Sequence, residues 1–209
     1  MGNDKQFVKV VNNWLKITFD FVVSIVAILV LIPIFLIISF LIKIDSKGPI
    51  IFKQVRVGKN GKEFKIYKFR TMVTDAERLG KQITVGHDPR ITRVGHFLRK
   101  FKLDELPQLF NVLKGDMSFV GPRPEVPRYT QLYNEEQKKV LTVRPGITDY
   151  ASIKYRNENE ILAKSEDPEK TYIEVIMPDK LKLNLKYIEE QSLWLDIKII
   201  FMTLYKIIK

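Results

Sequence analysis

The sequence contains no cysteine and only two histidines. The absence of cysteine excludes a disulfide framework and any metal site built on thiolates, and it is compatible with a reducing compartment. His87 and His96 do not have the spacing of a metal site. The sequence also lacks a Walker loop, a GxGxxG fingerprint and a GxSxG elbow. Any phosphate group would therefore have to be bound by side chains and metal, without a glycine-rich loop.

Acidic residues are in the minority. The chain has 35 Lys and Arg against 24 Asp and Glu, which gives a formal net charge of +11. Such an excess attracts nucleic acid, an anionic membrane surface or phosphorylated substrates, and charge alone does not choose among them. Because no nucleic-acid-binding motif is present and the basic residues are dispersed along the chain, we expect no nucleic-acid partner.

One long apolar run lies near the N-terminus. Residues 21–42 carry no charge, and at helical rise they cover about 30 Å, the thickness of a bilayer core. The run is too long for a secretory signal peptide, and no cleavage site follows it. Basic residues flank both ends, and Pro33 near the middle is expected to kink the helix. A re-entrant hairpin and a spanning helix are therefore both open, and we assign residues 1–44 to the membrane segment and 45–209 to the catalytic domain.

The rest of the chain predicts an α/β fold that is mostly helical with a small β-hairpin. Residues 49–58 and 63–72 are strand-like, and Asn60-Gly61 between them is a strong hairpin signal. Thr74 and Glu77 form a capping box that predicts a short helix. Apolar spacing predicts further helices over residues 94–101, 103–114, 130–143, 157–164 and 167–176.

The C-terminal stretch from Ser192 has an apolar helical face. The residues that form this face are Leu193, Ile197, Ile200, Phe201, Leu204 and Ile208. This pattern is typical of a helix that lies in the membrane interface, and equally of a helix that packs on a core.

Asp104 and Glu105 are the candidate catalytic residues. They fall in the first turn of the predicted 103–114 helix, where acidic residues often only cap the helix. Here they follow a stretch rich in arginine and lysine, and Pro-Arg-Pro comes after them. Two carboxylates among cations could bind Mg²⁺ and attack phosphorus, and an aspartate nucleophile gives a reactive acyl phosphate. The helix N-terminus would favour that phosphoryl group.

Several cations are candidates for binding phosphate or substrate. Arg123 lies between Pro122 and Pro124, which restrict its backbone, so it is suited to a fixed anion clamp. Lys68 and Arg70 share one face of the second strand at period two. Arg144 precedes Pro145-Gly146. Each of these residues, considered alone, fits an ordinary surface position better than a binding role.

Four runs carry a resemblance to a known family. They are residues 64–72 (FKIYKFRTM), 88–95 (DPRITRVG), 103–124 (LDELPQLFNVLKGDMSFVGPRP) and 143–146 (VRPG). Together they make the sequence similar to the bacterial sugar transferases, the monotopic phosphoglycosyl transferases. The resemblance extends from the apolar run through nearly the whole chain, which looks like the minimal catalytic form of the family.

The resemblance implies both a location and a reaction. It implies a re-entrant helix broken at Ile32-Pro33 on the cytoplasmic face of the bacterial inner membrane, in contact with membrane lipids, and interfacial C-terminal helices. It also implies ping-pong transfer of a sugar phosphate from a UDP-sugar to polyprenyl phosphate, such as undecaprenyl phosphate, with release of UMP. Such a reaction is the first membrane step in assembling a glycan, and a homo-oligomer stays open.

The resemblance also assigns roles to residues. Asp104 would be the nucleophile, and Glu105 would assist through Mg²⁺ and positioning, or by helping to deprotonate a reacting group. Arg123 of the Pro122-Arg123-Pro124 motif, together with Arg99, would hold phosphates.

One segment departs from the family pattern. Many members continue Gly-Trp-Ala-Gln after Arg-Pro-Gly-Ile-Thr, whereas residues 149–152 here are Asp-Tyr-Ala-Ser. We therefore assign no sugar or uridine contact to these four positions. Two readings without catalysis also stay open, namely a membrane-tethered basic binding module and a scaffold for other glycan enzymes.

Overall fold

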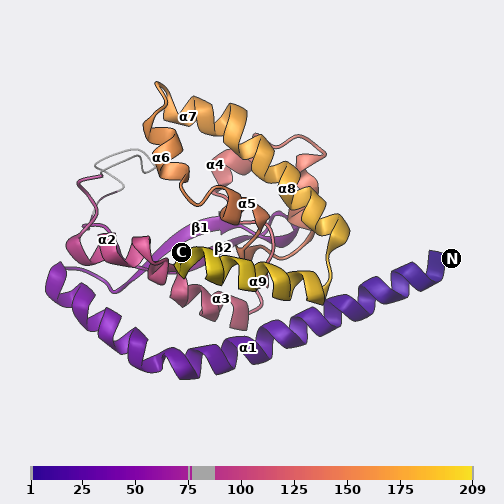
Figure 1. The fold of residues 1–209 in the computed structure, drawn as a ribbon, viewed down its shortest axis with the longest axis horizontal. Coiled ribbons are helices and arrows are strands. Elements are labelled where there is room, and N and C mark those ends of the chain that lie inside the picture. The colour runs from indigo at the N-terminus through magenta and orange to yellow at the C-terminus, as the bar shows by residue number, and fades with distance from the viewer. Residues whose placement is uncertain (1, 75, 77–87, 209) are drawn as a thin grey trace.

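The computed structural model describes residues 2–74, 76 and 88–208, so Glu77 of the predicted capping box and His87 lie outside the described residues. The first element is α1 (Gly2–Asp45), a single helix of 44 residues with Pro33 inside it. Figure 1 shows α1 as a long bent helix that runs beneath the rest of the molecule, with its N-terminal end extending past the domain. Proline removes one backbone hydrogen bond and bends a helix, so a bent course is expected here.

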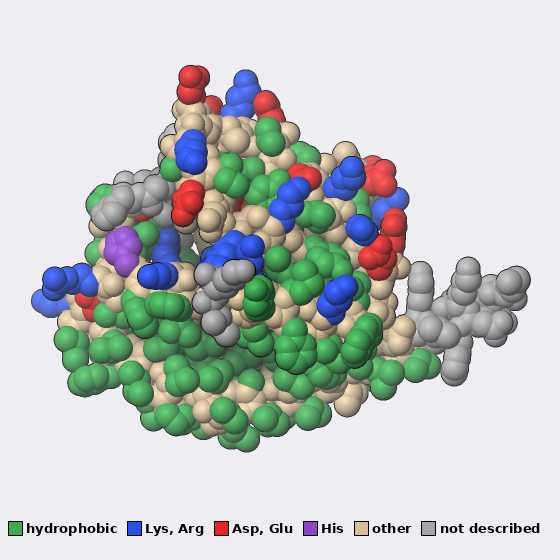
Figure 2. Space-filling model, viewed as in Figure 1, with side chains coloured by type: hydrophobic (Ala, Val, Ile, Leu, Met, Phe, Trp, Pro, Cys, Tyr) green, Lys and Arg blue, Asp and Glu red, His purple; other side chains and the backbone are tan. Residues whose placement is uncertain are grey.

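Most of α1 turns apolar side chains outward. Leu29, Val30, Leu36 and Phe40 are each more than 60% exposed, and Figure 2 shows a continuous apolar surface along the lower edge of the molecule. The helix is long and apolar enough to cross a membrane by length and composition. An apolar surface of this extent is unusual on a water-exposed protein and marks a membrane or partner contact.

The same helix packs on the domain through a polar stripe. Lys16 forms a buried ion pair with Asp196 of α9 (Leu193–Ile208), and its Nζ donates to the Val120 carbonyl at 2.9 Å. One turn further on, Asp20 accepts from Arg144 at 2.9 Å. Charges buried this deeply require partners. We call Lys16, Asp20, Arg144 and Asp196 the docking cluster.

The predicted hairpin is confirmed. Strands β1 (Ile51–Val57) and β2 (Glu63–Phe69) pair antiparallel, with Phe52 opposite Lys68. The short turn η1 (Lys59–Gly61) joins them, and Asn60 has φ 58°. Asparagine tolerates this left-handed conformation better than most residues, which explains why Asn-Gly marks the turn.

A second strand pair was not predicted. Strands β3 (Ser118–Val120) and β4 (Gly146–Thr148) pair in parallel. The two backbone segments approach so closely that a Cβ on Gly146 would lie 2.1 Å from the Gly121 nitrogen. A glycine pair therefore permits this contact, and it brings the segment after β3 against the segment before β4.

The helices that lead to the centre of the molecule differ in part from the prediction. Helix α2 (Arg93–Lys100) forms as expected. The predicted 103–114 helix is instead a 3-10 helix, η2 (Leu103–Gln108), followed by the short α3 (Leu109–Leu113). Pro107 lies inside η2, and its missing N–H does not support a regular α-helix there. Gly115 ends the segment with φ 81°, as a C-terminal cap does.

The C-terminal half is helical. The predicted 130–143 helix is wrong, because α4 (Pro127–Thr130) ends early and a turn separates it from η3 (Gln137–Thr142). After α5 (Tyr150–Lys154), α6 (Glu158–Ala163) and α7 (Pro168–Thr171), the π-helix η4 (Tyr172–Ile176) continues into α8 (Met177–Glu190). No helix was predicted over α8, because apolar and polar residues alternate with the period of a strand in Leu181-Lys182-Leu183-Asn184-Leu185.

Helix α9 lies along α1 (Figure 1) and is apolar on two sides. Ile199 is fully buried in a cluster with Val120 and Tyr187. Phe201 and Leu204 of the predicted apolar face are exposed. One side of this helix therefore packs on the domain, as predicted for a core-facing helix, while its location in the membrane interface stays a prediction.

Candidate active site

The two candidate carboxylates lie at the start of η2. Lys102, with φ 57°, turns the chain sharply out of α2, and Leu103 and Leu106 pack against a core cluster that includes Phe69. This packing leaves Asp104 only 7% exposed. Its Oδ1 is buried and has no hydrogen-bond partner among the residues that the structure describes. An unpaired buried carboxylate oxygen is costly, so Asp104 is a candidate for contact with a ligand or a reacting group.

Glu105 has the opposite environment. Its Oε1 accepts from Lys68 Nζ at 2.8 Å, and its Oε2 accepts from Arg123 Nη1 at 3.3 Å. Arg123 Nη2 forms a further ion pair with the same carboxylate. We call Asp104, Glu105, Lys68 and Arg123 the active cluster.

The pKa values of the two neighbouring carboxylates are shifted in opposite directions. Burial raises the pKa of Asp104, and this outweighs the lowering by Lys68. Burial would also raise the pKa of Glu105, but the charges and hydrogen bonds of Arg123 and Lys68 hold that pKa well below its usual value. Glu105 is thus a permanently charged partner for two cations, whereas Asp104 is a carboxylate of raised basicity. Two neighbouring acids whose pKa values are shifted in opposite directions are typical of catalytic sites.

Arg99 reaches the same region from α2. Its Nε donates to Thr71 Oγ1 at 2.9 Å, and its charge acts on Asp104. Burial lowers the pKa of Arg99. Helix α2 can approach Thr71 because Gly95 has no side chain, since a Cβ there would lie 2.2 Å from the Thr71 carbonyl oxygen. The sequence assigned Thr71 no role, although it lies in the 64–72 run that carries the family resemblance.

The Pro122-Arg123-Pro124 segment is fixed from several sides. The Arg123 N–H donates to Asp149 Oδ2 at 3.3 Å, and Gly146 N–H donates to the Pro122 carbonyl at 3.0 Å. Arg56 Nη1 donates to the Pro124 carbonyl at 3.2 Å.

Asp149 is fully buried, and its Oδ1 also caps α5 by accepting from Ser152 N–H at 2.6 Å. Asp149, to which the sequence assigned no substrate contact, thus supports Arg123 by accepting a hydrogen bond from the Arg123 backbone N–H. Only the tertiary fold reveals this role.

Three groups of predicted residues lie away from the active cluster. Arg70 donates to the carbonyls of Pro49 and Ser46, at 2.6 and 2.9 Å, and so ties the end of α1 to the hairpin. Arg144 is paired with Asp20 in the docking cluster. Ile32 and Pro33 lie within α1. The structure therefore does not bring the predicted phosphate ligands Arg70 and Arg144 to Asp104.

The helix-dipole expectation is also corrected. Asp104 and Glu105 begin a six-residue 3-10 helix, and no extended α-helix starts there. A short, irregular element has a weak dipole, so anion stabilisation must come from the cations around it.

A divalent cation would find limited protein ligands here. Within residues 2–74, 76 and 88–208 no group of three His, Cys, Asp or Glu side chains could hold a metal ion. The free Asp104 Oδ1, with Glu105 beside it, nevertheless fits Mg²⁺, which often takes one or two carboxylates and completes its shell with water and substrate phosphate.

A small cavity adjoins Arg123. Asp149, Ser152, Lys180 and Asn184 are among its lining residues, and its interior space is about 30 Å³. That volume holds only one or two water molecules, so it is too small for a sugar or a nucleobase.

Known proteins resemble the chain over nearly its full length. The sequence model of the family described as "Bacterial sugar transferase" matches residues 11–209. The UDP-glucose:undecaprenyl-phosphate glucose-1-phosphate transferase of Escherichia coli K12 is 40% identical over 201 residues, which cover 94% of this chain and 40% of that protein. An Aeromonas hydrophila UDP-N-acetylgalactosamine-undecaprenyl-phosphate N-acetylgalactosaminephosphotransferase is 39% identical over 93% of this chain and 44% of its own length.

For one shorter relative, the aligned region covers similar shares of the two proteins. A putative undecaprenyl-phosphate N-acetylgalactosaminyl 1-phosphate transferase of Bacillus subtilis is 47% identical over 122 residues, 58% of this chain and 68% of that protein. The chain spans about two fifths of the length of the E. coli and A. hydrophila proteins.

Proposed function

The chain belongs to the bacterial sugar transferase family, and on this premise we propose that it moves a sugar 1-phosphate from a UDP-sugar to polyprenyl phosphate, such as undecaprenyl phosphate. The relatives' names supply the substrate classes. The observation that carries the mechanism is the buried, unpaired Oδ1 of Asp104 beside three half-buried cations, Lys68, Arg99 and Arg123. The binding-module and scaffold alternatives give no reason for a buried carboxylate placed among these cations.

In the first step Asp104 acts as the nucleophile. A carboxylate oxygen attacks the phosphorus that carries the sugar, and the bond from this phosphorus to the bridging oxygen breaks. UMP leaves with that electron pair, and the sugar phosphate remains on Asp104 as an acyl phosphate. The raised pKa of Asp104 makes its ionised form a stronger nucleophile.

In the second step polyprenyl phosphate regenerates the enzyme. An oxygen of its phosphate attacks the same phosphorus, and the bond to Asp104 breaks. The electron pair of that bond restores the carboxylate, and the product is a polyprenyl diphosphate sugar. One aspartate thus divides a single displacement into two steps.

The neighbouring residues balance charge. Lys68 and Arg123 are held in place by Glu105, so they need no reorganisation when negative charge develops on phosphorus. The lowered pKa of Glu105 disfavours its use as a general base and favours a positioning role. Asp104 and Glu105 would hold Mg²⁺, which supplies further neutralisation of the diphosphate when bound.

The membrane arrangement is part of the proposal. We take α1 as re-entrant, with both ends on the cytoplasmic face, because it is bent and its polar stripe docks on the domain at Lys16 and Asp20. A spanning helix would place the residues before α1's apolar run outside the cell. Labelling of a cysteine introduced at Asn13 by an impermeant reagent added to intact cells would contradict the re-entrant topology.

Trapping the covalent intermediate tests the proposed function. The full chain in detergent is mixed with a UDP-sugar and Mg²⁺ without acceptor, quenched in acid and analysed by intact-protein and peptide mass spectrometry. We expect a sugar-phosphate adduct on the peptide that contains Asp104 and one equivalent of UMP. A screen of several UDP-sugars identifies the donor, and the absence of UMP release and of adduct with every donor would refute the proposal.

A further inference from the structure

Lys102 has an unusual backbone for a lysine. Its φ of 57° is left-handed, and among the described residues only Asn60 is a second non-glycine with positive φ. Asn60 belongs to a hairpin turn, whereas Lys102 joins α2 to η2. The Lys102 N–H donates to the Arg99 carbonyl at 3.2 Å, and its own carbonyl accepts from Glu105 N–H at 3.3 Å. Strained residues of this kind concentrate at functional sites.

The cations around Asp104 fall into two groups. Lys68 is bound to Glu105, and Arg99 is bound to Thr71. The charge of Lys102 also acts on Asp104, yet its side chain is exposed and forms no ion pair or hydrogen bond within the described part of the chain. Lys102 is therefore a cation beside Asp104 that is free to bind an incoming anion from solvent.

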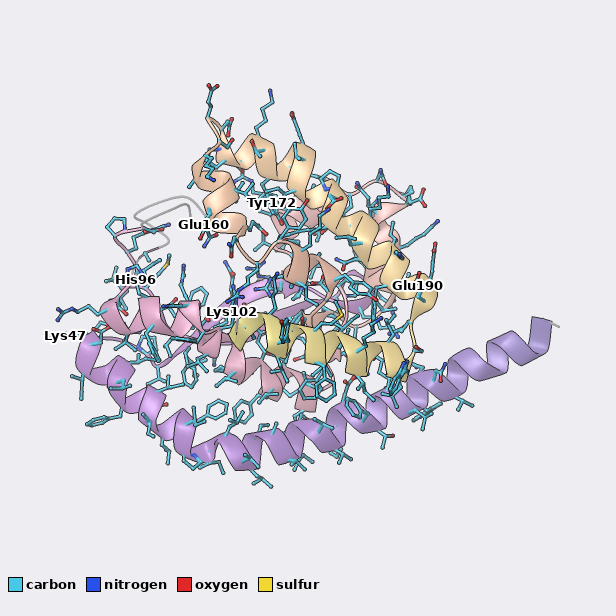
Figure 3. All side chains as sticks on the ribbon, viewed as in Figure 1. Lys47, His96, Lys102, Glu160, Tyr172 and Glu190 are labelled. Carbon is cyan, nitrogen blue, oxygen red and sulfur yellow. The ribbon has the colours of Figure 1, made fainter. Side chains whose placement is uncertain are left out.

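Lys102 also lies where the charged centre meets the apolar surface. Phe97 and Phe101, at the end of α2, are 54% and 40% exposed. Leu98 of the same helix packs on Ile38 and Ile42 of α1, so α2 is attached to the membrane helix. Figure 3 places Lys102 next to the end of α2, and Figure 2 shows cationic side chains directly above the apolar lower face.

We propose that Lys102 binds the phosphate group of the lipid-linked acceptor and brings it to the sugar phosphate on Asp104. This inference rests on the proposed function and assigns one residue to its second step. The acceptor phosphate and the covalent intermediate are both anionic, so their approach needs a cation that the donor has not already engaged. The donor diphosphate would meet the less exposed Arg99, Lys68 and Arg123, while Lys102 is exposed next to the exposed Phe101 and so is accessible to a lipid head group.

The test separates the two half-reactions. Lys102→Gln is prepared in the full chain, and UMP release from UDP-sugar alone is compared with the KM for polyprenyl phosphate in mixed micelles. We expect UMP release to stay within about twofold and the acceptor KM to rise about 10- to 100-fold, the loss of one charge-assisted hydrogen bond. Lys102→Arg should retain most of the acceptor affinity.

Matched variants control for the neighbourhood and the backbone. Lys100→Gln removes an exposed charge two residues away, which lies over the Phe101 ring at 5.5 Å, and should leave both half-reactions unchanged. Lys102→Gly relieves the backbone strain but lacks the amine, so it should raise the acceptor KM as Lys102→Gln does. If Lys102→Gly instead behaves like the unmodified protein, the side chain is not the acceptor ligand and the inference fails.

Further outcomes distinguish this inference from its alternatives. Equal slowing of UMP release in Lys102→Gln would assign Lys102 to the donor and overturn the inference, while the proposed function would stand. Weaker binding of Lys102→Gln to phosphatidylglycerol vesicles, with an acceptor KM unchanged once the protein is bound, would mean general attraction to anionic lipid and would also overturn it. Failure of the unmodified chain to release UMP would refute the proposed function itself.

Discussion

The docking cluster and the active cluster both contain carboxylates paired with cations, but the two clusters differ in how completely their carboxylate oxygens are hydrogen-bonded. In the docking cluster, Asp196 accepts from Lys16 and from Tyr187, at 2.6 Å for the latter. Asp20 accepts from Arg144 and from the Phe119 N–H. In the active cluster Glu105 is equally well paired, but Asp104 leaves one buried oxygen without a partner.

This difference matches the structural role of the docking cluster and the reactive role that we propose for Asp104. Burying a charge costs free energy unless a partner offsets that cost. The docking cluster offsets much of this cost, because each carboxylate oxygen of Asp20 and Asp196 has a hydrogen-bond partner, and it so fixes where α1 sits on the domain. The active cluster leaves the cost partly uncompensated at Asp104, and a reaction that consumes the negative charge of Asp104 would relieve it.

The largest effect is expected from Asp104→Asn. We expect UMP release to fall by at least about a thousandfold, since the amide is not a nucleophile. The melting temperature should stay the same or rise, because the variant no longer buries an incompletely paired carboxylate. Thermal unfolding in detergent and a UMP assay measure the two quantities. The exposed Glu135→Gln serves as a control, and residual turnover above a few per cent would contradict the nucleophile assignment.

The next effect is expected from Lys16→Met in the docking cluster. It leaves Asp196 buried without its cation, which should lower the free energy of unfolding by about 3–5 kcal/mol. Turnover per folded molecule should be unchanged at low temperature. Denaturant unfolding in detergent measures the loss, and the double variant Lys16→Met/Asp196→Leu should recover part of it. Lys198→Met, on the exposed side of α9, is the matched control, and an equal loss there would remove the distinction between the clusters.

The smallest effect is a shift in pH dependence. In the proposed mechanism UMP release requires ionised Asp104, so its rate should fall as the pH falls through the raised pKa of that group. Lys68 is the strongest of the charges that lower this pKa. Lys68→Met should therefore raise the pKa further and move the acid limb of the pH–rate profile to higher pH. Lys65→Met, an exposed lysine on the same strand, should leave the limb in place, and an unmoved limb in Lys68→Met would refute the coupling.

Much of the active cluster could be predicted from the sequence. Asp104, Glu105, Lys68 and Arg123 have the residue types that phosphate chemistry needs, and the prolines beside Arg123 fix its backbone locally. The hairpin followed from Asn60-Gly61 in the same local way. Features that depend on neighbouring residues alone are thus the ones that sequence patterns reveal.

The remainder depends on contacts between distant segments. Arg70 and Lys68 were predicted to share a strand face, but β2 ends at Phe69, and Arg70 turns to the end of α1. Arg144 was predicted to bind phosphate because a Pro-Gly turn follows it, yet its partner Asp20 is far away in the sequence. Asp149 acts on Arg123 through a backbone N–H. No local periodicity encodes such pairings.

The outward apolar face of α1 has a kinetic consequence. If that face is embedded in one leaflet, Asp104 stays at a fixed depth relative to the lipid head groups, and the acceptor reaches it by lateral diffusion. The effective acceptor concentration is then a mole fraction within a two-dimensional sheet, and diluting the acceptor with inert lipid slows the second step even when its amount per volume is constant. The helix thereby converts a search through the cell volume into a search over a surface.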